Sequence, residues 1–329
     1  MSSVVLVPAY QNLATLAGIL EQLTQANLPV IVVDDASTDG TAQWLDQWCN
    51  QGGNRWKITL KSNTGKGNAL TLGLAEAARK NFDATITIDA DGQHRVEDAL
   101  ALLADWKPGQ LLLGARNETA LDYPATSLFG RRLWSLGMLV LTGLEISDPV
   151  CGLRVYPTAH AAGIRCASGR YAWEEEFIVH AAHRGVVIDE RPIATVYLPA
   201  QTRVSHYNLF RDWTESILVF TTWFLRGILV SLPLRDHAQP LRHRGRSFRR
   251  LLGMTVFVSA MTGLATSWWI SALVIAWLAW KLQTVWIVAV ATTITAALLA
   301  NSLDTFSMML TIVITACVVT QAARPLCKN

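Results

Sequence analysis

The carboxy-terminal part of the chain contains a long stretch that is almost free of charge. Between Leu251 and Ala323, the only charged residues are Lys281 and Asp304. A run this long with so little charge is typical of segments that cross a lipid bilayer rather than of soluble helices. As a helix it would extend about 110 Å at ~1.5 Å per residue, enough to cross a core about 30 Å thick roughly three or four times. The alternative is a buried helical bundle that docks on a soluble domain.

The residues around this stretch agree with a membrane region. Tryptophans stand near its weak polar breaks, where an aromatic belt would lie, at Trp268, Trp269, Trp280 and Trp286. Arginines precede it and are opposed only by Asp236; they are Arg235, Arg242, Arg244, Arg246, Arg249 and Arg250. Positive charge beside membrane segments favours the cytoplasmic side, so we expect a multi-pass protein of the cell membrane whose preceding domain is cytoplasmic.

Composition narrows the classes of protein to which the chain could belong. The net charge of +3 gives no sign of nucleic-acid binding. The five cysteines, at positions 49, 151, 166, 317 and 327, include no close pair, which argues against a disulfide framework or a zinc site and favours a reducing compartment. No signal peptide is expected, because Met1-Ser-Ser leads directly into the strand pattern of 4–7.

The first 115 residues alternate between strand and helix patterns. Strands are expected at 4–7, 30–33, 56–60, 84–88 and 111–113, with helices between them, including one at 65–80 and one from about Val96. This alternation predicts an α/β fold with a mostly parallel sheet covered by helices on both faces, and ligands then bind at the carboxyl ends of the strands. Asp34, Asp35, Asp89 and Asp91 stand at such ends.

Beyond this region we expect helices near 127–141 and 173–183 and a turn at 147–152. The segment 208–232 is apolar but carries charges, as in a helix that lies in the membrane interface. The predicted domains are therefore 1–205 for the α/β domain, 206–250 for the interfacial helix and basic linker, and 251–323 for the transmembrane region.

Two motifs suggest phosphate chemistry. Asp89-Ala-Asp91-Gly-Gln93 offers two carboxylates and an amide oxygen, ligands that suit Mg²⁺ or Mn²⁺ held between protein and phosphate oxygens. The matching substrate is a nucleotide diphosphate compound; the alternative is an acidic turn after a strand. Gly65-Lys66-Gly67 lacks the spacing of a Walker loop and predicts a helix N-terminus, either plain or facing a phosphate.

The order of the motifs is more specific than any one of them. Val7-Pro-Ala-Tyr10, Val33–Thr41, Gly65–Ala69 and Asp89–Gln93 together resemble the family-two inverting glycosyltransferases, which have the GT-A nucleotide-sugar-binding fold. The resemblance covers about residues 3–200. Further motifs resemble the dolichol- or polyprenol-phosphate sugar synthase branch; they are Gly114-Ala-Arg116, Arg131-Arg132 and Ile146–Gly152.

The resemblance implies roles for individual residues. The nucleoside would be held by Pro8, Tyr10, Asp34 and Asp35. Asp89, Asp91 and Gln93 would bind the metal, and Lys66 and Ala90 would join them around the diphosphate. Arg116, Arg131 and Arg132 would grip an acceptor phosphate with help from Ser135, and Asp148 would lie beside the sugar. The chain departs from the family at Gln11-Asn12, where Asn-Glu is usual, and near position 200, where Arg203 and His206 would replace the usual basic loop as diphosphate contacts.

These features predict a membrane-bound, inverting, metal-dependent glycosyltransferase. It would move a sugar from a nucleotide diphosphate sugar to a polyprenyl phosphate, an acceptor that needs no protein base. A hydroxyl acceptor, as in a glycolipid or polysaccharide, would need a carboxylate base, either Asp148 or one of Glu174–Glu176. A membrane assembly subunit with a vestigial fold is the third alternative. The sugar, the nucleobase and the oligomeric state stay open, a homo-oligomer included.

Two clusters in the middle section have both a purely structural and a functional interpretation. Glu174–Glu176 is either a solvated helix start or lies near the sugar. Glu176, His180 and His183 share a helix face with metal-ligand spacing, but the sequence shows no second source of ligands, which favours a packed or solvated face.

Overall fold

The computed structural model of the 329-residue chain describes residues 1–116, 125–194 and 208–229. The chain forms two compact units. The first comprises Met1–Ser135 and Ile146–His237, and the second comprises Leu136–Glu145 and Ala238–Asn329. The predicted transmembrane region lies outside the described residues. Within the residues that are described, no helix is both long enough and apolar enough to cross a membrane.

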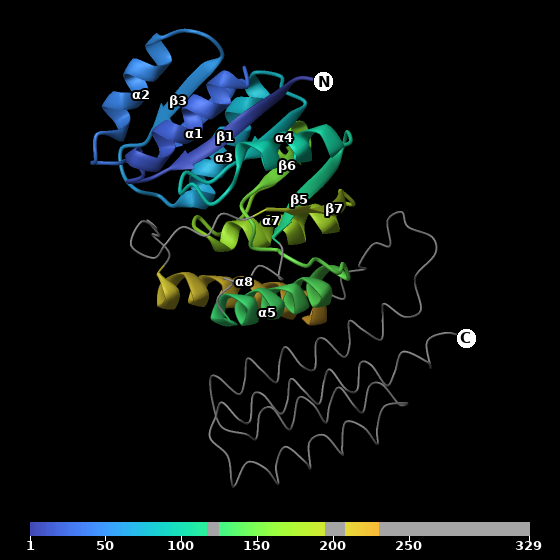
Figure 1. The fold of residues 1–329 in the computed structure, drawn as a ribbon. Coiled ribbons are helices and arrows are strands. Elements are labelled where there is room, and N and C mark those ends of the chain that lie inside the picture. Colours follow the sequence, from blue (N-terminus) through green and yellow to red (C-terminus); the bar gives the residue numbers. More distant parts are fainter. Residues whose placement is uncertain (117–124, 195–207, 230–329) are drawn as a thin grey trace, which may run out of the picture. The chain divides into compact units, whose positions relative to one another are not determined.

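A seven-stranded sheet forms the centre of the first unit (Figure 1). Its strands lie in the order β3-β2-β1-β4-β6-β5-β7. Their bounds are Ser3–Ala9 (β1), Val30–Asp34 (β2), Arg55–Thr59 (β3), Ala84–Thr87 (β4), Gln110–Arg116 (β5), Arg154–Pro157 (β6) and Val187–Ile193 (β7). All neighbours pair in parallel except β6, which runs antiparallel to both β4 and β5.

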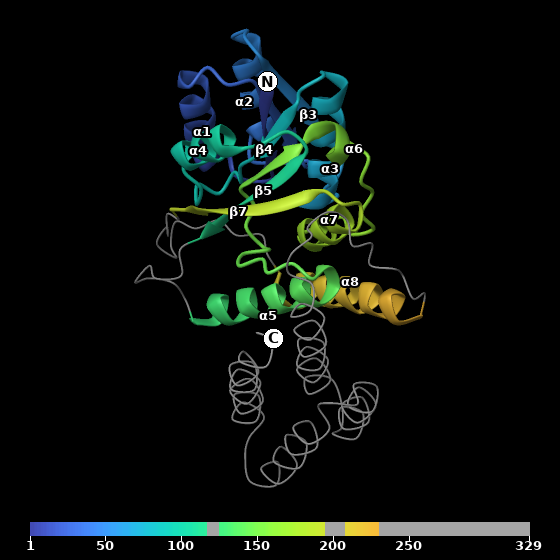
Figure 2. The same cartoon turned by 90° about the vertical axis from the view of Figure 1, so that its right-hand side faces the viewer.

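The helices cover both faces of the sheet, as the alternating pattern predicts. Their bounds are Leu13–Gln25 (α1), Thr41–Asn50 (α2), Lys66–Arg79 (α3), Val96–Asp105 (α4), Ala125–Thr142 (α5), Thr158–Ala162 (α6), Ala172–His183 (α7) and Leu209–Leu229 (α8). Figure 2 shows α1 and α4 on one side of the sheet and α3 and α6 on the other. Within the described residues, the five predicted strands and the helices predicted for the α/β domain are confirmed; β6, α6 and β7 were not predicted.

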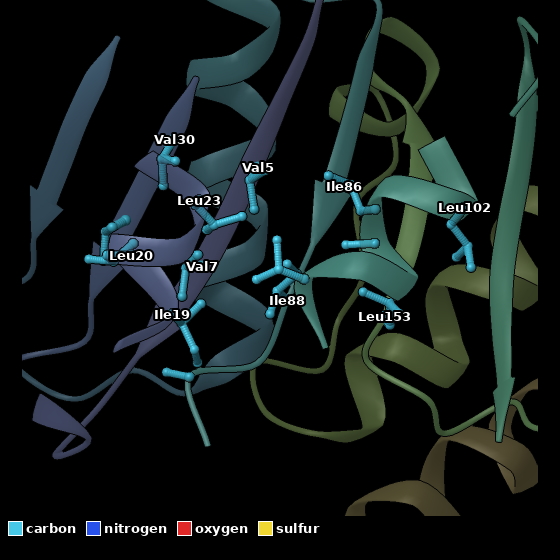
Figure 3. Packing of buried hydrophobic residues seen from close by; sticks show 14 of the residues in the cluster. Val5, Val7, Ile19, Leu20, Leu23, Val30, Ile86, Ile88, Leu102 and Leu153 are labelled. Atoms are coloured by element: carbon cyan, nitrogen blue, oxygen red, sulfur yellow. The ribbon is translucent and has the colours of Figure 1, made fainter. Parts of the chain in front are cut away.

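The core lies between the sheet and the helices α1 and α4 (Figure 3). Side chains alternate across a strand, so Val5 and Val7 of β1 point to this core, which also contains Leu20 of α1 and Leu102 of α4. The intervening Leu6 points to the other face, where it packs on Gly73 of α3; a Cβ at Gly73 would overlap the Leu6 side chain. Burial on both faces explains why β1 is continuously apolar.

Helix α8 belongs to the first unit and packs against α7. Trp223 of α8 and His180 of α7 pack edge to face, with their ring centroids 4.8 Å apart. Phe220 of α8 stacks on Trp134 of α5, with a centroid distance of 4.9 Å. The buried Asp212 accepts a hydrogen bond from the backbone N–H of Asn208 at 2.6 Å and so caps the start of the helix. A helix is therefore present at Leu209–Leu229 within the predicted segment 208–232, and one of its faces is covered by protein.

Candidate active site

The motifs come together at the carboxyl edge of β1, β2 and β4. The parallel pairing aligns Ala9 with Asp34, and the backbone N–H of Ile88 donates to the carbonyl of Leu6. The residues that follow these strands therefore share one edge of the sheet, which is where parallel sheets bind ligands. Pro8 is buried within β1, and Tyr10, just beyond its end, is partly exposed.

Hydrogen bonds join the first motif to the second. The side-chain amide of Gln11 donates to Thr38 Oγ1 at 2.8 Å, and its backbone N–H donates to Ser37 Oγ at 2.9 Å. Asp39 accepts from the backbone N–H of Leu13 at 3.0 Å, at the start of α1. Gln11, which stands at a departure from the family pattern, is thus used to hold the two loops together.

The acidic pair that follows β2 divides between two roles. Asp35 accepts hydrogen bonds from the backbone N–H groups of Thr64 and Gly65, both at 2.7 Å, and so fixes the chain just before α3. Asp34 is fully buried, and its Oδ1 accepts from the backbone N–H of Ser37 at 3.0 Å. Within the described residues, Asp34 Oδ2 is buried and has no hydrogen-bond partner. Of these two acids, Asp34 is therefore the one that offers a buried acceptor without a partner among the described residues.

Lys66 lies between two carboxylates at the start of α3. Its Nζ is 2.7 Å from Asp89 Oδ1 and 3.1 Å from Glu174 Oε2 of α7. Burial alone would lower the pKa of Lys66, but the two carboxylates outweigh it and raise that pKa well above its usual value. Asp89 responds in the opposite direction: burial would raise its pKa, but Lys66 and the nearby His94 hold it well below its usual value. Lys66 thus keeps Asp89 ionised.

Asp91 has a different environment. Its Oδ1 accepts from the backbone N–H of Gln93 at 3.0 Å, and its Oδ2 accepts from the Gln93 side-chain amide at 2.9 Å. Burial, and then the charge of Asp89, raise the pKa of Asp91. Two carboxylates that repel each other beside an amide are a donor set that suits a hard divalent cation, so the residues present fit the predicted Mg²⁺ or Mn²⁺. Ala90 stands between Asp89 and Asp91 in the sequence and is buried. Its carbonyl accepts a hydrogen bond from Thr15 Oγ1 at 2.5 Å.

The turn at 147–152 reaches this acidic site. A Cβ at Gly152 would overlap the carboxylate of Asp89, so the Gly152 backbone lies directly against that side chain. Thr87 Oγ1 holds it there by donating to the carbonyl of Gly152 at 2.7 Å. The fully buried Arg154 fixes the rest of the turn, donating to the carbonyls of Pro149 at 2.8 Å and Cys151 at 2.7 Å.

The other end of the turn carries a cluster of one acid and two arginines, in which Asp148 and Arg131 are buried and Arg116 is partly exposed. Arg116 makes a bidentate contact with Asp148, with Nε 2.7 Å from Oδ2 and Nη2 2.8 Å from Oδ1. Arg131 donates to Asp148 Oδ2 at 3.3 Å and to the carbonyl of Arg116 at 2.9 Å. Burial would raise the pKa of Asp148, but the two arginines outweigh it and lower that pKa.

The other residues predicted to contact the acceptor or the diphosphate differ in their exposure and contacts. Arg132 is exposed, whereas Arg131 is 2% exposed, so the two consecutive arginines do not act as one pair. Ser135 Oγ donates to the carbonyl of Ile146 at 2.5 Å and so ties α5 to the turn. Arg203 and His206 lie outside the described residues.

The three acids of α7 are all buried, so their interpretation as a solvated helix start is wrong. Glu174 contacts Lys66. Glu175 is held neutral: burial is the main cause that raises its pKa to about 8. Glu176 accepts from the backbone N–H of Ser168 at 2.8 Å. The sequence did not reveal the partner of Lys66 or the role of Arg154; the signal for Arg154 was a charge inside an apolar strand pattern.

Comparison with known proteins agrees with this geometry. Residues 4–124 match the profile of the family described as Glycosyl transferase family 2. The undecaprenyl-phosphate mannosyltransferase of Micrococcus luteus is 26% identical over 204 residues, covering 60% of this chain and 84% of that protein. The polyprenol monophosphomannose synthase of Mycolicibacterium smegmatis is 25% identical over 238 residues, covering 69% and 88%.

Solved structures show the same fold. The mannosyl-3-phosphoglycerate synthase of Rubrobacter xylanophilus superposes with a TM-score of 0.51 at 21% identity, covering 75% of this chain and 79% of that one. A mannosyltransferase of Pyrobaculum calidifontis, solved with GDP-Man and Mn²⁺, gives a TM-score of 0.50 at 17% identity, covering 97% and 86%. Residues 4–124 thus match a glycosyl transferase family 2 domain, and the sheet and helices form a GT-A-like α/β fold. The predicted resemblance is confirmed.

Proposed function

We propose that this protein transfers a sugar from a nucleotide diphosphate sugar to a polyprenyl phosphate. The observation that carries the proposal is the turn at 147–152. One end of this turn lies against Asp89, and the other end holds Arg116 and Arg131 through Asp148. A cation site for a diphosphate and a pair of arginines for a phosphate are thus joined by a few residues. The names of the two bacterial relatives, both polyprenyl-phosphate sugar transferases, support the same acceptor.

The donor nucleotide would lie along the edge formed by β1 and β2. Pro8 and Tyr10 would border the nucleoside, and the buried Oδ2 of Asp34 would accept one of its hydrogen bonds. A buried acceptor without a partner is costly, so a ligand donor at this point would both bind and relieve it. Asp35 would contribute indirectly, since it fixes the start of α3.

The diphosphate would lie over Asp89, Asp91 and Gln93. These residues would hold Mg²⁺ or Mn²⁺, and a divalent cation bound there neutralises the charge that develops on the leaving diphosphate. Lys66 keeps Asp89 ionised and in place through its short ion pair. The solved Pyrobaculum enzyme contains Mn²⁺ with its nucleotide sugar, which supports a divalent cation in this fold.

The acceptor would be oriented by Arg116 and Arg131. A phosphate oxygen is already anionic, so it can attack the sugar without a protein base, and planar guanidinium groups are well suited to hold it. The sugar passes through a cationic, oxocarbenium-like state, as in glycoside hydrolysis, and attack from the face opposite the leaving diphosphate inverts the anomeric centre. Asp148 is a poor candidate for a base, because two arginines stabilise its ionised form.

The membrane would supply the acceptor. The apolar stretch 251–323 and the arginines before it predict a multi-pass anchor with the catalytic domain on the cytoplasmic side. Helix α8 would then lie at the membrane interface beside the domain that it packs on.

The proposal is tested with the full chain purified in detergent. It is incubated with a panel of nucleotide sugars, Mg²⁺ or Mn²⁺, and either polyprenyl phosphate or the matching polyprenol. We expect a lipid-linked sugar from the phosphate acceptor alone, with the anomeric configuration of the donor inverted, as read by NMR of the product. Transfer to the polyprenol or to a glycolipid hydroxyl, with none to the phosphate, would overturn the proposal, as would the absence of transfer across the whole panel.

A further inference from the structure

Three side chains with metal-binding atoms, none of which has a role in the proposed active site, meet at α7. Cys166 lies in the segment between α6 and α7, and Glu176 and His180 lie one turn apart on α7. Their ligand atoms all lie within 4.8 Å of one another. The sequence showed only ligands on the helix, and the cysteine spacing argued against zinc. The fold supplies the second source, because it brings Cys166 onto the helix face of Glu176 and His180.

The ligand types indicate the kind of cation. A thiolate and an imidazole favour Zn²⁺ and similar borderline metals over Mg²⁺, and a carboxylate completes a common set of three. Sites with three protein ligands keep a fourth position for water. His180 Nε2 is 3.5 Å from Glu176 Oε1. Two ligands of a tetrahedral zinc ion, each about 2.0–2.1 Å from the metal, stand roughly 3.3 Å apart. This pair is therefore close to the required spacing.

The carboxylate of Glu176 is already oriented by its surroundings. Ser168 donates to Oε2 twice, from its backbone N–H at 2.8 Å and from Oγ at 2.6 Å. Ala167 donates to Oε1 from its backbone N–H at 3.0 Å. A carboxylate has about four acceptor positions, so these bonds leave room for a cation at Oε1. Hydrogen bonds of this kind are what hold metal-ligating carboxylates in place.

We propose that Cys166, Glu176 and His180 bind a borderline divalent cation such as Zn²⁺, separately from the hard-cation site at Asp89 and Asp91. The thiolate and the carboxylate together carry two negative charges, which a divalent cation cancels in this half-buried position. The edge of Trp223 packs on the ring of His180 and restricts its orientation. The proposal does not depend on the acceptor or on sugar transfer.

A cation at this position would brace the start of α3. It would tie the turn that contains Cys166 to α7, and three residues further on, the carbonyl of Gly169 accepts from the backbone N–H of Asn68 at 3.0 Å. Gly67 packs so closely on Trp173 of α7 that a Cβ there would overlap it. The bound cation would therefore stabilise the turn and helix against which Lys66 and its neighbours rest.

The test uses the metal-free full chain in detergent, with Mg²⁺ in excess to occupy the hard-cation site. Co²⁺ is added as the probe, because cobalt bound by a thiolate has a sulfur-to-metal charge-transfer band in the near ultraviolet. We expect one equivalent of Co²⁺ with this band and displacement of it by Zn²⁺. Cys166→Ser should remove the band, whereas Cys49→Ser, a matched change at another half-buried free thiol, should leave it unchanged. No band in the parent protein, or an equal band in Cys166→Ser, would overturn the proposal.

Two further measurements keep the test decisive if Cys166→Ser folds poorly. Ser168→Ala keeps all three ligands but removes a bond that orients Glu176, so Co²⁺ affinity should fall about tenfold. In the unaltered protein, Zn²⁺ should slow alkylation of Cys166, mapped by mass spectrometry, without slowing that of Cys49. Equal alkylation rates with and without Zn²⁺ would contradict a site at Cys166.

Discussion

Two acidic positions of the domain have the same side chain and opposite surroundings. Asp91 follows β4, lies partly exposed beside the carboxylate of Asp89, and has a raised pKa. Asp148 lies buried between Arg116 and Arg131 and has a lowered pKa. Repulsion between carboxylates favours a bound cation, whereas a carboxylate already neutralised by two guanidinium groups has little tendency to bind one or to accept a proton.

The difference separates what each acid contributes. Asp91 is arranged for a ligand and contributes little to folding, since burial and the charge of Asp89 disfavour its ionised form. Asp148 is arranged for its neighbours, because its charge compensates the buried Arg131 and the partly exposed Arg116. A motif of acids in a sequence does not distinguish these cases; the groups that surround each acid do. Substitutions at the two positions should therefore separate stability from activity.

The largest expected effect is on stability, at Asp148. Asp148→Ala leaves Arg116 and Arg131 close together without their carboxylate, and breaking a buried ion pair in this way costs about 3–5 kcal/mol. We expect the free energy of unfolding, measured by denaturant titration with tryptophan fluorescence, to fall by about that amount. Activity should fall at least as much as the folded fraction, because Asp148 also positions the two arginines proposed to hold the acceptor.

The matched control is Asp189→Ala on β7. Asp189 also contacts an arginine, Arg191 at 3.2 Å, but both side chains are well exposed. Exposed pairs contribute at most about 1 kcal/mol, so this variant should stay close to the parent. If Asp148→Ala were as stable as Asp189→Ala, the ion pairs of Asp148 would contribute no more to stability than an exposed pair.

The second effect is on cation binding and turnover, at Asp91. Asp91→Asn keeps the shape but removes one of the two charges that would hold the cation, so kcat should fall about 100- to 1000-fold. Mn²⁺ affinity, measured by electron paramagnetic resonance without acceptor, should fall as well. The free energy of unfolding should stay the same or rise slightly, because a repulsive pair is removed.

Glu97→Gln is the control for charge alone. Glu97 lies in the first turn of α4, six residues from Asp91, and is exposed. It should retain Mn²⁺ affinity and turnover. Unchanged Mn²⁺ affinity in Asp91→Asn would show that the cation binds elsewhere and would remove the basis of the comparison.

The sequence predicted most of the nucleotide-binding half because the signals there are local. Apolar strands alternate with amphipathic helices, and the motif residues directly follow the strands, so topology alone brings them to one edge. The prediction failed at β6 and β7. Arg154 interrupts the apolar pattern of β6, and its charge is tolerated only because backbone carbonyls of the turn and of Glu174 accept its hydrogen bonds. Strand β7 is half exposed and takes its place from pairing with β5.

The same limit applies to the site. Lys66 stood out as a helix-start residue, but its partner Glu174 is 108 residues away in the chain. Three consecutive acids in α7 resemble a solvated helix start, yet each is buried with a partner from a different part of the fold. Cys166 gave no signal, because it lies outside the helix of Glu176 and His180 and its separation from them matches no metal-ligand spacing. Partners that come from distant segments are set by packing, which a single sequence does not display.

The smallest effect concerns Glu175 on α7, an acid of a third kind, whose pKa is raised mainly by burial. Its pKa of about 8 in the folded protein exceeds the value of about 4.3 in an unfolded chain. The folded state therefore binds more protons between these values, and its stability declines as pH rises through that window. Glu175→Gln removes the charge, so the decline should disappear, and the free energy of unfolding of the variant should exceed that of the parent by about 2 kcal/mol near pH 8.

Glu21→Gln, an exposed change on α1, is the control and should retain the decline. Unfolding curves at pH 5 and pH 8 test this; parallel pH profiles for parent and Glu175→Gln would show that Glu175 ionises freely and that burial alone does not hold an acid neutral in this helix.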